Sequence, residues 1–232
     1  MWWLTLEPRL DLNEGRLRLA FGGGKFLAID FINDRTRYHK PLRGKNELLA
    51  RALGLHRKPA LHIFDATFGL GEDAWTLARL GARVTACERE PLLYELAKNA
   101  LEAARSHPGM AEVASRVDLR SGDSQEFLRR SQADDQPDCI FLDPMFPEST
   151  KTALPRGEMQ LLRGWLGSRL KDGSLLESSD RSILDLALGI ARERVAVKRP
   201  LKSPPLRGGF IHQYRGRTIR YDLYLPGSLE SL

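Results

Sequence analysis

The sequence predicts an α/β protein with a doubly wound, mostly parallel sheet, a closing antiparallel hairpin and a small N-terminal cap. From residue 60 onward, short apolar runs alternate with segments of helical periodicity, an order that is typical of parallel sheets. The first apolar run, residues 61–64, is followed by Asp65, Gly69 and Gly71. A strand, a glycine-bearing turn and a helix start together form a cradle of the kind that holds nucleotide-like ligands.

The N-terminal part, residues 1–58, is expected to form a cap over the domain made by residues 59–232. It contains an alternating run, consecutive glycines and a second apolar run, which together predict a β-hairpin. A basic run and a short helix with one apolar face follow, and Gly54 is placed to end that helix. The hairpin strands and the helix are expected at residues 16–21, 26–31 and 46–53.

Within residues 59–232, apolar runs predict strands and amphipathic runs predict helices. Gly81 is placed to end the first of these helices, and Pro91 fits the first turn of the next. The expected strands are residues 61–65, 83–88, 116–120, 138–143 and 195–198, and the closing hairpin pairs residues 210–214 with 218–225. The expected helices are residues 72–80, 91–105, 124–130, 157–170 and 180–192.

The formal net charge of +6 favours a polyanionic partner such as a nucleic acid. The charge is unevenly distributed along the chain. Eight Lys or Arg residues against one acid lie between Arg35 and Lys58, and nine against one lie between Arg192 and Arg220. We therefore expect these two basic stretches to contact phosphates.

The two cysteines, Cys87 and Cys139, fall in expected strands and lack the spacing of metal ligands. Neither a disulfide nor a metal site is expected, and a reducing cytoplasm fits this pattern. The residues after Met1 lack the charged segment and the long apolar core of a signal peptide. No apolar run approaches the length of a membrane span, so no membrane contact is expected.

Acidic residues close four of the expected parallel strands, namely Asp65, Glu88, Asp123 and Asp143. The carboxyl ends of parallel strands share one edge of the sheet, where such folds bind ligands. Four carboxylates in one pocket require hydrogen-bond donors or a cation. S-adenosylmethionine (SAM) offers ribose hydroxyls, a sulfonium and an ammonium group, whereas the anionic pyrophosphate of a dinucleotide would be repelled. The pattern therefore predicts SAM as the cofactor.

The run Asp143-Pro144-Met145-Phe146 follows the fourth expected strand directly. An Asp-Pro-x-aromatic sequence at a strand end has no role in hydride transfer. It suits the transfer of a methyl group to a planar amine, because a carboxylate and a carbonyl can accept the two N–H groups of that amine. The sequence therefore favours a methyltransferase over a dehydrogenase.

Four motifs in order carry a resemblance to a known family: 65–74 (DATFGLGEDA), 87–89 (CER), 142–147 (LDPMFP) and 197–200 (VKRP). The chain resembles the class I SAM-dependent methyltransferases, whose fold is Rossmann-like. More narrowly, it is similar to the ribosomal RNA small subunit methyltransferase J family over roughly residues 16–226. The resemblance implies a cytoplasmic enzyme that methylates the exocyclic N2 amine of a guanine in 16S ribosomal RNA. Its partner would be 16S rRNA or the small ribosomal subunit.

Motif positions within the resemblance imply the cofactor-binding residues. Asp65 should orient the glycine turn, Glu88 should hold the ribose hydroxyls, and Asp123 should meet the adenine edge. The full expected set is Asp65, Thr67, Gly69, Gly71, Glu72, Asp73, Glu88, Arg89, Asp123, Ser124 and Asp143.

The catalytic residues implied by the same positions are Asp143, Pro144 and Phe146. The lone pair of guanine N2 is delocalised into the ring, and hydrogen bonds from its N–H groups to Asp143 and Pro144 would localise and aim it. Phe146 would stack on the extruded base. Rate acceleration then comes from positioning and electrostatics. The residues expected to bind RNA are Arg37, Lys40, Arg43, Lys45, Lys198 and Arg199.

The tetrad by itself leaves other acceptors open, namely adenine N6, another RNA guanine or a protein glutamine. An RNA-binding ribosome assembly factor without catalysis is the alternative from a different class. The intact Asp143 tetrad and Glu88 argue against it. A nicotinamide-dependent dehydrogenase is disfavoured by Asp143-Pro144 and by the lack of a hydride-transfer constellation.

Overall fold

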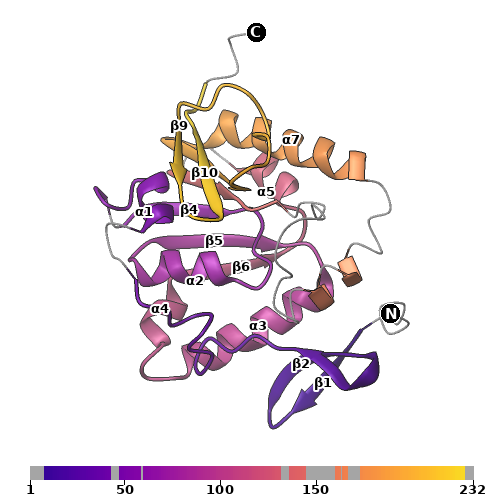
Figure 1. The fold of residues 1–232 in the computed structure, drawn as a ribbon. Helices are drawn as coiled ribbons and strands as arrows, with labels where there is room; N and C mark the ends of the chain where they lie inside the picture. The colour runs from indigo at the N-terminus through magenta and orange to yellow at the C-terminus, as the bar shows by residue number, and fades with distance from the viewer. Residues whose placement is uncertain are drawn as a thin grey trace.

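The computed structural model describes residues 8–42, 47–58, 60–131, 136–144, 160–162, 164–166 and 173–227 (Figure 1). The main body is a seven-stranded sheet with the order β6-β5-β4-β7-β8-β10-β9. Its strands are β4 (His62–Asp65), β5 (Arg83–Glu88), β6 (Val117–Ser121), β7 (Cys139–Leu142), β8 (Arg194–Pro200), β9 (His212–Arg215) and β10 (Ile219–Tyr224).

The strands from β6 across to β8 are mutually parallel, and β10 runs antiparallel to both β8 and β9. The predicted doubly wound, mostly parallel sheet with a closing hairpin is therefore confirmed. Because β4 lies between β5 and β7, the strand order reverses beside it. Ligands of such sheets bind at that switch point, outside the carboxyl ends of the strands.

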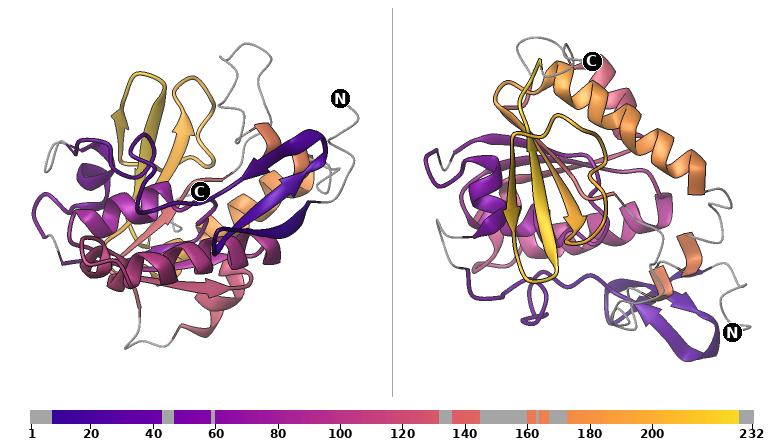
Figure 2. Two further views of the ribbon diagram at one scale, coloured as in Figure 1. Left: turned by 90° about the horizontal axis from the view of Figure 1, so that it is seen from below. Right: turned by 45° about the horizontal axis from the view of Figure 1, so that its top comes forward.

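Helices cover both faces of the sheet (Figures 1 and 2). The described helices are α1 (Leu48–Leu53), α2 (Glu72–Arg79), α3 (Pro91–Arg105), α4 (Ala111–Ser115), α5 (Ser124–Arg130) and α7 (Gly173–Ile190). Alternate residues of the central strands supply the two cores: Phe141 packs with the α2 and α3 side, while Ile140 and Leu142 pack with the α7 side. A strand buried on both faces reads as a continuous apolar run, as the sequence does here.

A separate three-stranded antiparallel sheet forms the N-terminal part, with the order β1-β2-β3. Its elements are β1 (Arg9–Asn13), β2 (Arg16–Phe21), the 3₁₀ turn η2 (Gly22–Gly24) and β3 (Lys25–Leu27). The hairpin from β2 to β3 was expected, but its second strand ends at Leu27 rather than at residue 31, because the Asp30 carboxylate accepts the N–H groups of Ile32 and Asn33 and turns the chain there. Strand β1 was not expected. The sequence does carry a turn signal before β2, namely the dipeptide Glu14-Gly15. Both residues adopt positive φ (50° and 77°) in the two-residue turn between β1 and β2.

Two helical predictions need correction. Helix α4 was not anticipated, and α7 begins at Gly173 rather than at Asp180 and ends at Ile190. The stretch 173–179 is rich in Ser, whose modest helix preference hid the first turns of α7. Of the helix expected at 157–170, residues 160–162 and 164–166 are described and are helical, and the rest lies outside the described residues.

Helix α1 packs against β8, β9 and β10, so an N-terminal helix covers C-terminal strands. The Cys139 thiol on β7 donates to the Leu53 carbonyl (3.3 Å), and the Arg194 guanidinium donates to the Ala52 carbonyl (3.4 Å). Gly54 ends the helix in the left-handed conformation, as its sequence position predicted. Among the described helices, none combines the length and the apolar character needed to cross a membrane.

Candidate active site

A cavity of about 620 Å³ opens at the carboxyl edge of the central strands. This volume lies within the range of small-molecule sites. Most of the expected cofactor residues line it, namely Thr67, Gly69, Glu72, Asp73, Glu88, Arg89, Asp123, Ser124 and Asp143. Asp65 and Gly71 lie behind the lining residues. They contact those residues and so help to hold them in place.

Asp65 ends β4 and is almost completely buried. Its carboxylate accepts a hydrogen bond from the Thr67 N–H (3.0 Å) and so shapes the start of the glycine turn. Thr67 in turn accepts the backbone N–H of Asp143 at its Oγ1 (2.7 Å). Burial raises the pKa of the Asp65 carboxyl to about 7, against the lowering effect of the Thr67 hydrogen bond. The ends of β4 and β7 are therefore joined directly beneath the cavity.

Gly71 precedes α2 and adopts a left-handed conformation, with φ at 74°. A Cβ atom at this position would lie 2.6 Å from Cζ of Phe68 and 3.1 Å from Cζ of Phe31, and both rings are buried. The turn thus needs glycine both for its backbone conformation and for the packing of aromatic rings beneath it.

Gly71→Ala is expected to lower the free energy of unfolding by about 2–4 kcal/mol, since backbone strain adds to overpacking. Gly69→Ala is the matched control, because its φ is also positive (58°) but the nearest atom to a Cβ is the Thr67 carbonyl oxygen at 3.8 Å. The control should lose about 1 kcal/mol from backbone strain alone. Urea unfolding of both variants measures the difference, and equal losses would contradict the packing argument.

Glu88 ends β5 and is buried beside the glycine turn. One carboxylate oxygen accepts the Gly69 N–H (2.9 Å), and the other accepts the Glu90 N–H (2.8 Å). Burial raises the pKa of the Glu88 carboxyl to about 7, although both backbone hydrogen bonds oppose the rise. The carboxylate is therefore held in one orientation at the cavity wall.

Asp123 and Ser124 reach the cavity from the start of α5. Asp123 caps this helix, because its carboxylate accepts the Gln125 N–H (2.8 Å). Ser124 is buried, and Arg89 at the same wall is exposed. Among the residues that the structure describes, no group of three or more His, Cys, Asp or Glu could hold a metal ion.

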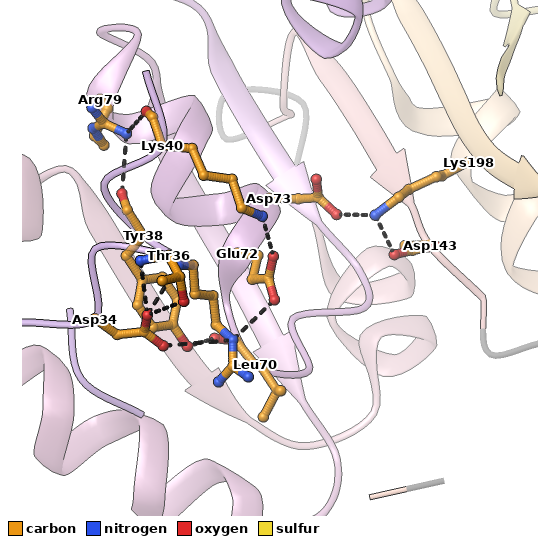
Figure 3. A network of polar contacts seen from close by, with 11 residues as sticks. Asp34, Thr36, Tyr38, Lys40, Leu70, Glu72, Asp73, Arg79, Asp143 and Lys198 are labelled. Carbon is orange, nitrogen blue, oxygen red and sulfur yellow. Dashed lines mark hydrogen bonds and ion pairs between the residues drawn. The ribbon is translucent and has the colours of Figure 1, made fainter. Parts of the chain in front are cut away.

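Lys198 lies inside the cavity between two carboxylates (Figure 3). Its ammonium donates to Oδ2 of Asp73 on α2 (2.6 Å) and to Oδ2 of Asp143 after β7 (2.8 Å). Burial acts to lower the pKa of Lys198, but the two carboxylates outweigh it and raise that pKa well above its ordinary value. The sequence suggested that Lys198 contacts phosphate, and in the structure its ammonium is bonded to two carboxylates inside the cavity.

The segment before α1 is tied to the glycine turn and to the start of α2 (Figure 3). The Tyr38 hydroxyl donates to the Leu70 carbonyl (2.8 Å). Glu72, the first residue of α2, pairs with Arg37 (3.1 Å) and with Lys40 (3.1 Å). Arg37 is buried, whereas Lys40 is largely exposed. Both cations therefore stabilise the glycine turn and the start of α2 from outside the cavity.

The remaining expected RNA and catalytic residues fall into three groups. Arg199 is buried, and its guanidinium donates to the Pro204 carbonyl in the loop after β8 (3.0 Å). Arg43, Lys45 and Phe146 lie outside the described residues. Asp143 and Pro144 both line the cavity.

Sequence reasoning missed part of the cavity wall. Leu162 and Leu166 line it from the helical residues between 160 and 166, and Ser179 and Ile183 line it from α7. The spacing of Leu162 and Leu166 indicates one face of a helix, but spacing alone does not distinguish a core-facing side from a cavity-facing one.

The cavity fits the cofactor predicted from the sequence. Glu88 presents a fixed, buried carboxylate, which is the acceptor that two adjacent ribose hydroxyls require. Glu72 and Asp73 line the cavity from the start of α2, and Leu93 and Ile183 add apolar walls. The carboxylates of Asp73 and Asp143 at the same site favour a cationic ligand over an anionic one.

Comparisons with known proteins agree with this geometry. Residues 5–226 match the family described as "Putative SAM-dependent methyltransferase". The chain is 40% identical over 202 residues to the ribosomal RNA small subunit methyltransferase J of Rhodopseudomonas palustris, covering 85% of this chain and 93% of the relative. It is 36% identical over 203 residues to the protein of the same name from Thioalkalivibrio sulfidiphilus, covering 87% of this chain and 76% of that one.

Among solved structures, the chain is similar to a SAM-dependent methyltransferase from Neisseria gonorrhoeae, with a TM-score of 0.72 and 26% identity. The match covers 98% of this chain and 86% of that protein. The family resemblance inferred from the four motifs is thus confirmed. The chain belongs to the SAM-dependent methyltransferases, within the ribosomal RNA small subunit methyltransferase J family.

Proposed function

We propose that this protein transfers a methyl group from SAM to the exocyclic N2 amine of a guanine in 16S ribosomal RNA. One observation carries the proposal: Asp143 and Pro144 follow β7 and line the same cavity as Glu88. Hydrogen-bond acceptors for a planar amine therefore lie within one site with an acceptor for ribose hydroxyls. The names of the relatives supply the RNA substrate. Two free, buried cysteines fit a reducing cytoplasm.

Each group in the cavity has a distinct part in the proposed reaction. Bound SAM would supply an electrophilic methyl group on a cationic sulfonium. Glu88 would hold its ribose hydroxyls, and Asp123 with Ser124 would meet the adenine edge. Residues 1–58 are the proposed cap. Within it, the Tyr38 hydroxyl donates a hydrogen bond to the glycine turn.

Asp143 and Pro144 act on the acceptor amine. The Asp143 carboxylate and the Pro144 carbonyl would each accept one N–H of the planar amine, which draws the nitrogen lone pair out of conjugation. The Asp143 backbone is fixed by Thr67, so the acceptor is positioned before substrate arrives. Proline removes a competing backbone N–H donor at this position. Phe146 keeps its proposed role as the stacking partner of the base.

We infer the RNA-binding surface from the exposed Lys and Arg side chains that lie near the cavity. The β9–β10 turn and the loop after β8 lie beside Pro200 and Ile219, which line the cavity. Lys202, Arg215 and Arg217 are exposed there, and in the described part of the chain none of them pairs with a carboxylate. Phosphates flanking an extruded base would meet this rim first.

The double variant Lys202→Ala/Arg217→Ala is expected to weaken RNA binding and to flatten its salt dependence. Each lost phosphate contact should reduce the slope of log K against log salt by about 0.7–0.9. The matched control is Arg83→Ala/Lys98→Ala, which removes the same charge from exposed positions at the start of β5 and on α3. Filter binding at several salt concentrations measures both slopes, and identical slopes for the two pairs would exclude this rim.

The decisive experiment is methylation with labelled SAM of unmodified 16S rRNA, both naked and in assembled small subunits. The RNA is digested to nucleosides, and label in N2-methylguanosine is the expected result. Label in another nucleoside would change the acceptor to adenine N6 or another base. No label, with SAM still bound in a parallel titration, would indicate a different acceptor such as a protein glutamine. A protein that binds RNA but not SAM would instead fit the assembly-factor alternative.

A further inference from the structure

We propose that Lys198 is a positioning residue of the methyl transfer: it bridges Asp73 and Asp143, and so keeps the Asp143 carboxylate ionised and correctly oriented toward the acceptor amine. The inference rests on the proposed function, since it assigns Asp143 the role of amine acceptor. It adds a residue whose side chain acts through Asp143 rather than on the substrate.

The geometry of the bridge is specific. Lys198 extends from β8, Asp73 from the first turn of α2, and Asp143 from the end of β7, so one ammonium joins three elements (Figure 3). Both carboxylate Oδ2 atoms lie within 2.8 Å of the same nitrogen. All three side chains are mostly shielded from solvent, with exposed fractions of 21%, 22% and 35% for Lys198, Asp73 and Asp143. An ion pair in such surroundings is screened far less than one on an open surface.

The charged neighbours explain why a cation is needed here. Asp65 at the end of β4 interacts electrostatically with Asp73, Asp143 and Lys198. Tyr221 on β10 is paired in register with Lys198, and its hydroxyl stays protonated because burial raises its pKa well above the ordinary value. Lys198 is therefore the positive charge of a cluster whose other charged members are carboxylates.

Two consequences follow for Asp143. Two carboxylates held this close without a cation favour sharing a proton, and a protonated Asp143 would be a poorer acceptor for the amine N–H. The hydrogen bond from Lys198 to Oδ2 also fixes the plane of the Asp143 carboxylate. The hydrogen bond from the Asp143 backbone N–H to Thr67 fixes the backbone from which that side chain extends. Lys198 thus controls both the charge and the direction of the acceptor.

The test compares Lys198→Met with wild type for kcat across pH 6 to 9. The variant is expected to lose about 10²-fold in kcat at pH 7, because a misplaced catalytic group costs that much. Expressed as a ratio to wild type, its activity should recover as pH rises and the shared proton leaves. Adding Asp73→Asn to Lys198→Met should remove most of this pH dependence, since Asp143 then lacks the neighbouring carboxylate with which it shares the proton. Lys198→Arg should retain the wild-type pH profile.

A binding measurement separates this role from simple loss of structure. Calorimetric titration with SAM and with its product S-adenosylhomocysteine, which lacks the sulfonium charge, should show that Lys198→Met binds both. At pH 9, where the shared proton has left, it should also favour SAM over the product more strongly than wild type does, since the cavity has then lost a positive charge.

A ratio of kcat values that stays constant with pH, or an unchanged preference between the two ligands at pH 9, would overturn the proposal. Wild type without any methylation activity would instead refute the proposed function, so the two failures are distinguishable.

Discussion

Asp143→Ala is expected to lower kcat by about 10³-fold while the protein remains folded and still binds SAM. The substitution removes the carboxylate that would accept the amine N–H, and a single preorganised hydrogen-bonding group in an active site is worth about 10²–10³-fold. Single-turnover methylation of 16S rRNA measures the chemical step directly.

Asp143→Asn is the informative companion variant. It keeps the shape of the side chain and its backbone bond to Thr67, but it removes the charge. We expect a loss smaller than that of Asp143→Ala, because an amide oxygen remains a hydrogen-bond acceptor. Turnover like that of wild type in the alanine variant would remove Asp143 from the mechanism, whatever the fate of the asparagine variant.

Glu88→Gln is expected to weaken SAM binding by about 10²-fold, because hydrogen bonds to a charged acceptor contribute about 1.5–3 kcal/mol each. The same change should relieve a cost in the folded protein. Burial raises the pKa of Glu88 to about 7 from an ordinary value of 4.5, so folding takes up a proton between these values. Stability from this group is therefore fully present below pH 4.5 and falls as pH rises to 7.

The glutamine side chain does not titrate, so the pH dependence that Glu88 adds to the stability of wild type is absent from the variant. Relative to wild type, the free energy of unfolding of Glu88→Gln should be higher at pH 8 than at pH 5. Urea unfolding at the two pH values measures this difference, and calorimetry at pH 8 measures the affinity for SAM. Undiminished SAM affinity would exclude Glu88 from the ribose role, and a relative stability that does not change with pH would contradict the burial argument.

Local signals in the sequence predicted much of the fold. Pro91 in a first turn marked the start of α3, and both α3 and α5 begin where they were expected. Strand ends likewise brought Glu88 and Asp143 to one edge of the sheet. These features depend on a few neighbouring residues, and alternation of strands and helices then determines the side on which they meet.

The role of Lys198 depends on contacts that no local pattern encodes. It lies 125 positions after Asp73 and 55 after Asp143, and the three meet only because β8 lies beside β7 at the start of α2. Arg37 is a similar case: the basic run suggested a contact with RNA phosphate, yet its guanidinium is buried against Glu72. Charge in a sequence shows that a partner is needed, and the tertiary structure decides which partner it is.

The packing of α1 has a consequence for synthesis on the ribosome. Arg194 reaches the carbonyl of Ala52, which was made 142 positions earlier. The apolar face of α1, including Leu49 and Leu53, gains its full cover once the strands up to Tyr224 have emerged. The nascent chain must therefore carry an uncovered helix through most of its elongation, and a chain halted before β10 would present that surface to chaperones and proteases. Release of a correctly closed domain is thus tied to completion of its last strand.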